Sequence, residues 1–271
     1  MATAVICEFN PFHNGHKYLL ESAKNVLKEP VIAIMSGSFT QRGEVAVCDK
    51  FVRAKSALES GADLVLELPV VFSLSGAEGF AKAGVAIASA FDCTNYLAFG
   101  SESGDCELLK KSANAVCDER VQALVRDGMK NGGYYPRELE NAVKTVFGDE
   151  ISSVLCEPNN ILGIEYIKAL NGTGVEPFSV ARTGVAHDSR IAGEGFASAS
   201  HIREMLRNGE NAKKYAPYIP DEITFPENLD RPLLYRLRTM TREDIAKLPD
   251  VGEGLENRIA DAAVRCSTSS E

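Results

Sequence analysis

Residues 8–16 of the chain read EFNPFHNGH, and they separate two segments of different periodicity. Before them lies a continuous apolar run over residues 2–7, which is typical of a buried strand. After them, apolar residues recur at helical spacing over residues 15–27. The stretch therefore predicts a strand, a turn through residues 10–12 and a helix that begins near Gly15.

The same alternation of short apolar runs and longer helical patterns continues along the chain. Strands are predicted at residues 2–7, 31–35, 63–68, 96–99 and 178–181. Helices are predicted at residues 15–27, 51–60, 79–89, 107–129, 136–146, 161–170 and 200–207. We expect Asn159-Asn160 and Asn171-Gly172 to cap the two ends of helix 161–170. Continuous apolar strands that alternate with helices predict an α/β fold with a parallel sheet covered on both faces.

A change of composition predicts a second, smaller domain near the end of the chain. Residues 215–228 contain three prolines and show no clear periodicity, which indicates a linker. Residues 229–265 read as helical throughout. We therefore predict an α/β domain at 1–214 and a helical C-terminal domain at 215–271.

Composition argues against several classes of protein. No stretch approaches the ~20 apolar residues of a membrane span, and no signal peptide is recognisable, so we expect a cytoplasmic protein without membrane contact. The seven cysteines form no C-x-x-C pair and there are only four histidines, so no structural zinc is expected. The net charge of −9 disfavours non-specific binding to nucleic acid. Residues 203–265 contain 11 basic and 12 acidic residues, a net of −1, and repel RNA least.

The two histidines of the motif point to phosphate chemistry. His13 and His16 are three residues apart at the predicted start of a helix and share one face. The free N–H groups and positive dipole end of that helix add an anion site, and Gly15 lets a ligand approach the backbone closely. We interpret the motif as a cradle for a triphosphate, in which both imidazoles stabilise charge during attack at the α-phosphorus. The alternative is a polar turn with a helix cap.

EFNPFHNGH resembles the H-x-G-H motif of the nucleotidyltransferase superfamily and, more narrowly, that of the bacterial tRNA(Met) cytidine acetate ligase family. Five further stretches match that family in order, SGSFTQRGE (36–44), DLVLELP (63–69), FGSE (99–102), PNNILGIEYIKAL (158–170) and ASASHIRE (197–204). The resemblance spans about residues 2–265. It implies a Rossmann-like nucleotidyltransferase sheet with flanking helices. It also implies that ATP and acetate form acetyl-adenylate, whose acetyl group passes to N4 of the wobble cytidine of elongator tRNA(Met).

We expect the motif and its flanks to bind ATP. The nucleotide-binding residues predicted there are Ile6, Cys7, Glu8, Phe9, Asn10, Pro11, Phe12, His13, Asn14, Gly15, His16 and Lys17. The resemblance implies further ATP contacts at Gly100, Asn159, Asn160, Arg182, Ser200 and Arg203. Ordinary structural readings stay open for these positions, as a strand-to-helix turn, helix caps and surface arginines. Mg²⁺ is expected to neutralise the pyrophosphate, with no metal ligand from a protein side chain.

For the residues that contact the acceptor, the sequence leaves two interpretations open in each case. Gln41 and Arg42 lie in the predicted loop after the second strand, where they recognise the acceptor or belong to a solvated turn. Arg236 and Arg238 lie in RPLLYRLRTMTR (231–242), which reads either as a tRNA contact or as the basic face of an amphipathic helix. LPDVGEGLENRI (248–259) resembles a helix-hairpin-helix turn, and an ordinary glycine-containing turn is the alternative.

Three remaining polar positions receive no catalytic role. Glu67 lies inside an apolar run, where a buried carboxylate needs a partner, so we expect a structural partner for it. His187-Asp188 and His201 show no pattern that suggests chemistry.

The sequence departs from the family pattern in two places. Family members usually continue into a segment rich in Lys and Arg, of the K-[ST]-K-R-Y-T kind, whereas here Arg265 is followed by CSTSSE. AHD at 186–188 stands where the family tends to show a tyrosine before the histidine. We therefore expect acetate activation more firmly than transfer to tRNA. The rival functions are an adenylyltransferase for a small phosphorylated acceptor and a nucleotide-gated tRNA-binding adaptor without turnover.

Overall fold

The computed structural model describes residues 1–182 and 195–269, and the chain divides into two compact units. The first unit is Met1–Asp221 and the second is Glu222–Glu271. Sequence analysis placed the domain boundary at 214/215 instead. The proline-containing segment after 214 stays with the first unit because Asn14 N donates a hydrogen bond to Tyr215 O at 2.9 Å. Ala216 is also buried against residues of the last helix of that unit.

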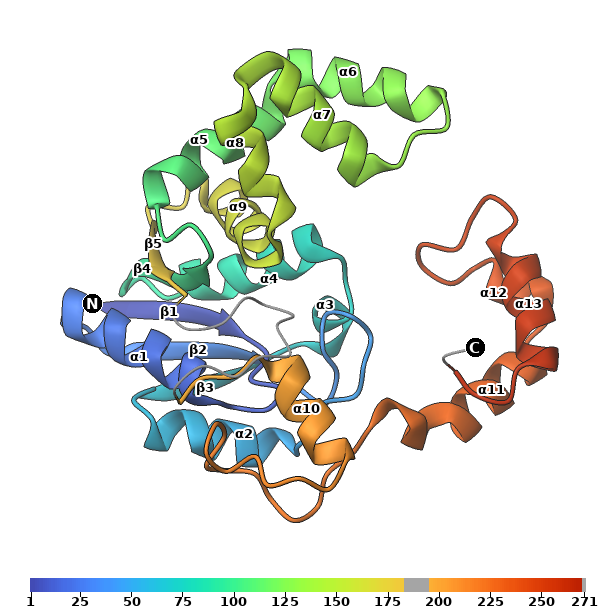
Figure 1. The fold of residues 1–271 in the computed structure, drawn as a ribbon, viewed down its shortest axis with the longest axis horizontal. Coiled ribbons are helices and arrows are strands. Elements are labelled where there is room, and N and C mark those ends of the chain that lie inside the picture. Colours follow the sequence, from blue (N-terminus) through green and yellow to red (C-terminus); the bar gives the residue numbers. More distant parts are fainter. Residues whose placement is uncertain (183–194, 270–271) are drawn as a thin grey trace. The chain divides into compact units, whose positions relative to one another are not determined.

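Five parallel strands form the sheet of the first unit in the part of the chain that the structure describes (Figure 1). They are β1 (Ala2–Cys7), β2 (Val31–Ser36), β3 (Leu64–Leu68), β4 (Thr94–Ser101) and β5 (Glu176–Ala181). Their order is β3-β2-β1-β4-β5, so the direction of winding reverses at β1. Ligands of open α/β sheets bind at the carboxyl ends of the strands, at such a switch point. The motif at residues 8–16 follows β1 and therefore lies there.

Helices cover both faces of this sheet, as predicted. The first part of the unit contains α1 (Asn14–Leu27), α2 (Lys50–Glu59), α3 (Val70–Ser73) and α4 (Ala77–Ser89). Between β4 and β5 lie α5 (Cys106–Cys117), α6 (Glu119–Lys130), α7 (Tyr135–Phe147), α8 (Asp149–Ser153), η1 (Val154–Cys156) and α9 (Pro158–Leu170), and α10 (Ala199–Arg207) follows β5.

Alternation along β1 divides the core into two layers. Ala4 and Ile6 pack on one side of the sheet with residues of α4, α5 and α9. Val5 and Cys7 pack on the other side with residues of α1 and α2. Successive side chains of a strand point to opposite faces, so a continuous apolar strand serves both layers. The predicted α/β fold is confirmed.

Two helix predictions were wrong in detail. Residues 107–129 are not one helix, because Asp118 has an extended backbone that ends α5 and its side chain accepts a hydrogen bond from Arg120 N to begin α6. Asn159 and Asn160 do not cap α9, because the helix begins three residues before the predicted start, at Pro158, with Glu157 at the N-cap. Asn171 ends that helix as predicted.

Glu67 has the structural partner that was expected, although it is not buried. Its carboxylate lies 2.6 Å from Lys50 Nζ, at the start of α2. β3 is an edge strand, and Glu67 is exposed there. The expectation of a buried carboxylate was wrong, because an apolar run on an edge strand does not guarantee burial of every position.

The second unit is helical among its described residues. It contains η2 (Pro226–Leu229), α11 (Asp230–Thr239), α12 (Arg242–Ile245) and α13 (Leu255–Arg265). Residues 231–242 do not form one continuous helix, because Met240 is extended and Thr241 caps α12. In the described part of the chain, no helix is both long and apolar enough to span a bilayer.

Candidate nucleotide site

A cavity of about 290 Å³ opens at the carboxyl ends of the strands. Its walls come from the motif after β1, the loop after β2, the ends of β4 and β5, and the starts of α9 and α10. Of the predicted site residues, those that line it are Ile6, Cys7, Glu8, Phe9, Asn10, His13, Gly15, His16, Gln41, Arg42, Gly100, Asn159, Arg182, Ser200 and Arg203. The fold thus brings most of the predicted positions to one place.

The two histidines are held by backbone groups at the start of α1. His13 is the N-cap, and its Nδ1 accepts a hydrogen bond from Gly15 N at 3.0 Å. His16 Nδ1 accepts one from His13 N at 3.3 Å. The two rings stack with 3.7 Å between centroids and 25° between planes. A Cβ at Gly15 would lie 2.9 Å from His13 Cε1, so this glycine makes room for the imidazole.

Both imidazoles are neutral in this environment. Burial, together with the charges of Arg182 and Arg203, lowers the pKa of His13 to about 3. Burial likewise holds the pKa of His16 well below 6.5, with contributions from His13 and Arg182. Because each Nδ1 accepts a hydrogen bond, the ring proton resides on Nε2. Each ring therefore offers an Nε2–H donor.

Arg53 fastens the strand ends beneath the cavity, and sequence reasoning missed it. It is 1% exposed on α2. Its guanidinium donates to the backbone oxygens of Cys48 at 3.1 Å, Glu8 at 2.6 Å, Ser36 at 3.1 Å and Gly37. It thereby joins the ends of β1 and β2. An arginine in an amphipathic helix normally reads as a surface residue, so the sequence carried no signal for this role.

The motif also orders the loop after β2. Glu8 Oε1 accepts a hydrogen bond from Gln41 N at 2.6 Å, and Asn10 Oδ1 accepts one from Val47 N at 2.7 Å. Gln41 and Arg42 consequently lie in the cavity wall beside Glu8. Burial raises the pKa of the Glu8 carboxyl, and the Gln41 N–H opposes that shift. The predicted acceptor loop is therefore physically joined to the predicted phosphate motif.

Glu102 sets the start of α9, a role that the sequence did not reveal. Its carboxylate accepts hydrogen bonds from Asn159 Nδ2 at 2.5 Å and from Asn160 N at 2.9 Å. Asn160 Oδ1 in turn accepts from Ser103 N at 3.1 Å. Asn159 lines the cavity, whereas Asn160 does not. The two asparagines that looked equivalent in sequence thus have different surroundings.

The start of α10 forms part of the cavity wall and contacts the motif. Ser198 is the N-cap of α10, and its Oγ lies 3.0 Å from Ser200 Oγ. Arg203 Nη1 donates to Asn10 O at 2.8 Å. Arg182 also lines the cavity, and its buried Nε has no hydrogen-bond partner among the described residues. A buried donor left without a partner is costly, so this wall suits an anionic ligand that accepts its hydrogen.

Other predicted site residues lie outside the cavity wall. Lys17 lies 3.7 Å from Glu21 on the exposed face of α1. Asn14 donates through Nδ2 to Gly195 O and Lys214 O and so anchors later segments. Three more predicted nucleotide-binding residues do not line the cavity, namely Pro11, Phe12 and Asn160.

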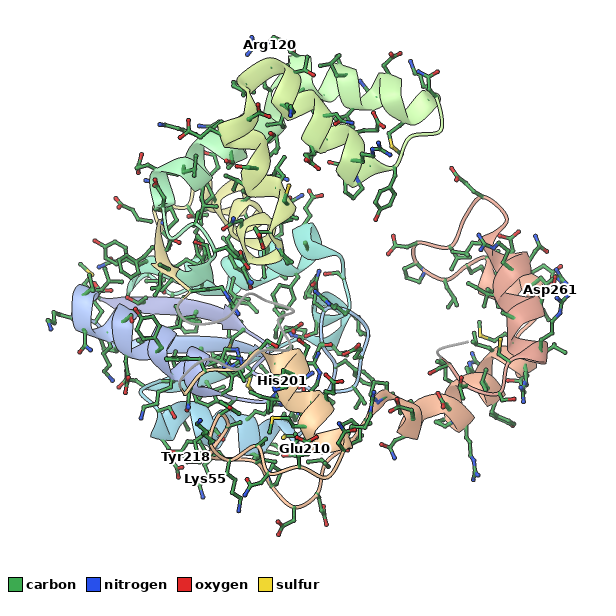
Figure 2. The ribbon with its side chains drawn as sticks, in the orientation of Figure 1. Lys55, Arg120, His201, Glu210, Tyr218 and Asp261 are labelled. Carbon is green, nitrogen blue, oxygen red and sulfur yellow. The ribbon has the colours of Figure 1, made fainter. Side chains whose placement is uncertain are left out.

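No catalytic role was expected for His201 or for His187-Asp188. His201 lies on α10 (Figure 2) and does not line the cavity. His187-Asp188, and with them the departure at 186–188, lie outside the described residues.

In the second unit, the two candidate tRNA contacts differ. Arg238 donates to Ala263 O at 2.6 Å and to Cys266 O at 2.8 Å, so its guanidinium fastens the end of α13. Arg236 is exposed on α11. The predicted hairpin turn carries the carboxylates of Asp250 and Glu253 beside Arg258, and two carboxylates make it a poor phosphate site.

The described residues contain no group of three or more His, Cys, Asp or Glu side chains placed to hold a metal ion.

The chain resembles known proteins along its whole length. The HIGH Nucleotidyl Transferase family model matches residues 1–271. A tRNA(Met) cytidine acetate ligase of Caldanaerobacter subterraneus subsp. tengcongensis is 39% identical over 283 residues, which cover 97% of this chain and 70% of that protein.

Solved structures give the same result. Apo Thermotoga maritima TmcAL superimposes with a TM-score of 0.90 at 32% identity and covers 99% of this chain and 69% of that chain. The crystal structure of T. maritima TmcAL bound with alpha-thio ATP gives a TM-score of 0.88 at 33% identity, over 98% of this chain and 68% of that chain.

Proposed function

Because this chain belongs to the tRNA(Met) cytidine acetate ligase family of HIGH nucleotidyltransferases, we propose that it is an ATP-dependent ligase. Its substrates are acetate, ATP and elongator tRNA(Met), and its product carries an acetyl group on N4 of the wobble cytidine. A tRNA-modifying enzyme acts where tRNA is present, which is the cytoplasm.

One observation carries the proposal. Two neutral imidazoles and an unpartnered arginine Nε–H line a single cavity at the switch point of the sheet. Such donors suit a polyphosphate, which offers only acceptors. The T. maritima relative, which shares this fold, was crystallised with alpha-thio ATP. We therefore assign His13, His16, Arg182 and the other lining residues to ATP.

In the first step, an acetate oxygen attacks the α-phosphorus and pyrophosphate leaves. Negative charge grows on the phosphoryl oxygens as this happens. The Nε2–H groups of His13 and His16 are already oriented by their backbone hydrogen bonds, so they stabilise that charge without reorganising. Mg²⁺ held by the phosphates and water supplies charge neutralisation when bound.

In the second step, the cytidine amine attacks the acetyl carbonyl of acetyl-adenylate and AMP leaves. Both steps are direct displacements, so no covalent enzyme intermediate is required. Gln41 and Arg42 lie beside Glu8 at the side of the cavity formed by the loop after β2. We place the acetate and the incoming cytidine on that side, and Arg236 is the remaining candidate tRNA contact of the second unit.

The test uses the full chain with labelled acetate, ATP, Mg²⁺ and bulk tRNA. We expect acetate-dependent exchange of pyrophosphate into ATP, together with acetylated cytidine in digested tRNA. His13→Ala should abolish both. Exchange that depends on a phosphorylated acceptor instead of acetate would point to an adenylyltransferase. Tight tRNA binding without any turnover would point to an adaptor.

A further inference from the structure

The helices α6 and α7 form a hairpin with an ordered tip. Gly133 N donates to Gly128 O at 3.0 Å, and Glu138 N donates to Tyr134 O at 3.0 Å. Gly132 closes the turn with φ +82°. A Cβ added at Gly128 or Gly133 would overlap the Glu138 side chain, so the end of α6 and the start of α7 are in close contact. The backbone of the tip is therefore held in one arrangement.

Two adjacent aromatic side chains of this tip face solvent. Tyr134 is 73% exposed and Tyr135 is 49% exposed. The packing of the hairpin comes from other residues, including Val121, Val125 and Val143, which are buried in the core. The tyrosines are therefore not needed to hold the hairpin against the rest of the unit. Neighbouring exposed tyrosines suit an interaction surface.

The same hairpin carries three basic residues on α6 and α7. Arg126, Lys130 and Arg137 are exposed, and none of the three forms an ion pair with another described residue. Arg126 and Lys130 are four residues apart on α6 and so share a face. Asp127 lies between them and Glu138 packs on the tip, so three basic and two acidic residues leave the local charge at +1 in a chain whose net charge is −9.

We propose that this hairpin tip, residues 126–137, is an RNA contact surface. Tyr134 and Tyr135 stack on unpaired bases, while the three basic side chains contact phosphates. RNA loops are recognised in this way, because their unstacked bases expose faces to aromatic rings. The inference rests on the proposed function, whose target base lies in a tRNA loop.

The position of the tip agrees with this proposal. Figure 1 shows the loop between α6 and α7 on the side of the first unit to which the β1 arrow points. The cavity opens at the carboxyl ends of the strands, which lie on that side. Because the rest of the chain is predominantly acidic, an RNA approaching the cavity is attracted where unpaired cations gather.

The experiment compares two variants of the full chain with wild type. One is Tyr134→Ala with Tyr135→Ala, and the other is Arg126→Ala with Lys130→Ala and Arg137→Ala. Three quantities are measured for each, namely the KM for tRNA in acetylation, the Kd for tRNA at several salt concentrations, and acetate-dependent pyrophosphate exchange without tRNA. The matched control is Lys55→Ala with Lys82→Ala and Lys110→Ala, which removes the same charge from lysines that have carboxylate partners.

We expect the tyrosine variant to raise KM and Kd for tRNA about tenfold. The basic-residue variant should also raise KM and Kd for tRNA about tenfold. In addition, its slope of log Kd against log salt concentration should be smaller than that of wild type by about two. Tyr134→Phe with Tyr135→Phe keeps the rings and should remain within about twofold of wild type. Exchange should be unchanged in every variant.

The proposal is overturned if both alanine variants bind tRNA like wild type, which is also the result expected for a protein-docking surface. It is equally overturned if the lysine control weakens tRNA binding as much as the basic-residue variant does. A chain that binds tRNA but does not acetylate it would refute the proposed function, and the Kd measurements would still decide on the surface.

Discussion

Asn10 O accepts a hydrogen bond from Arg203 Nη1 at 2.8 Å, across 193 positions of the chain. This bond joins the turn after β1 to α10, and both of these segments line the cavity. Arg203→Ala should raise the KM for ATP in the exchange reaction about tenfold, because a charge-assisted hydrogen bond and a cation are lost together. Arg203→Lys keeps the cation, so its KM for ATP should lie between those of wild type and Arg203→Ala. A KM within twofold of wild type in Arg203→Ala would contradict this assignment.

The buried neutral state of His13 predicts a pH dependence of stability. Its pKa is about 3 in the folded chain and about 6.5 in an unfolded one. Between these values the unfolded state binds more protons, so the free energy of unfolding decreases as pH falls below 6.5. The decrease approaches about 1.4 kcal/mol per pH unit. The free energy of unfolding is measured with urea at pH 7.5, 6.5 and 5.5. Its slope against pH should be shallower for His13→Gln than for wild type. Equal slopes for the two proteins would refute the buried neutral form of His13.

Arg53 predicts a large loss of stability without any contact to substrate. Arg53→Met should lower the free energy of unfolding by about 3–5 kcal/mol, because four backbone oxygens lose their donor. The control is Lys55→Met on the same helix, at an exposed position (Figure 2), which should change stability by less than about 0.5 kcal/mol. Urea unfolding checks both. Equal effects of the two variants would show that Arg53 does not fasten the strand ends.

Glu102 predicts an effect on nucleotide binding through Asn159. Glu102→Gln replaces one accepting oxygen by a donor, so one of its two hydrogen bonds to the start of α9 is lost. We expect the KM for ATP to rise about tenfold while kcat changes little. Glu107→Gln, at the exposed start of α5, serves as the control and should leave the KM unchanged. A fall in kcat with no change in KM would assign Glu102 a different role.

Gly163 predicts a steric coupling between α9 and the cavity. A Cβ added there would lie 2.7 Å from Cε2 of Phe99, which itself lines the cavity. Gly163→Ala should therefore destabilise the chain by about 1–3 kcal/mol and raise the KM for ATP. Gly252→Ala adds the same atom where nothing lies within 4 Å. It should therefore change neither the stability of the chain nor the KM for ATP. Thermal unfolding and exchange kinetics measure the two effects separately.

The fold could be predicted because its determinants are local. The buried strands are short apolar runs and most of the long helices show their own periodicity, so the predicted strand at residues 2–7 coincides with β1. The geometry of the histidine motif could be predicted for the same reason. Its two histidines, the glycine between them and the helix that they cap are contiguous in the chain, so spacing alone indicates their geometry.

The supporting residues could not be predicted because their partners are distant backbone atoms. Arg53 donates to oxygens at the ends of two strands, and no side-chain pattern in α2 marks such a role. Asn159 and Asn160 are neighbours of the same type, and only the fold shows that the side chain of Asn159 bonds Glu102 whereas that of Asn160 bonds Ser103 N. Packing between remote segments determines which polar residues face the cavity.

The bond between Asn10 and Arg203 also has a consequence during synthesis. The ribosome releases the histidine motif first, and at about 5–20 residues per second Arg203 follows roughly 10–40 seconds later. Until then the motif has its strand and its helix but lacks the wall formed by α10. A nascent chain that ends before α10 therefore lacks the part of the cavity wall that Ser198, Ser200 and Arg203 supply.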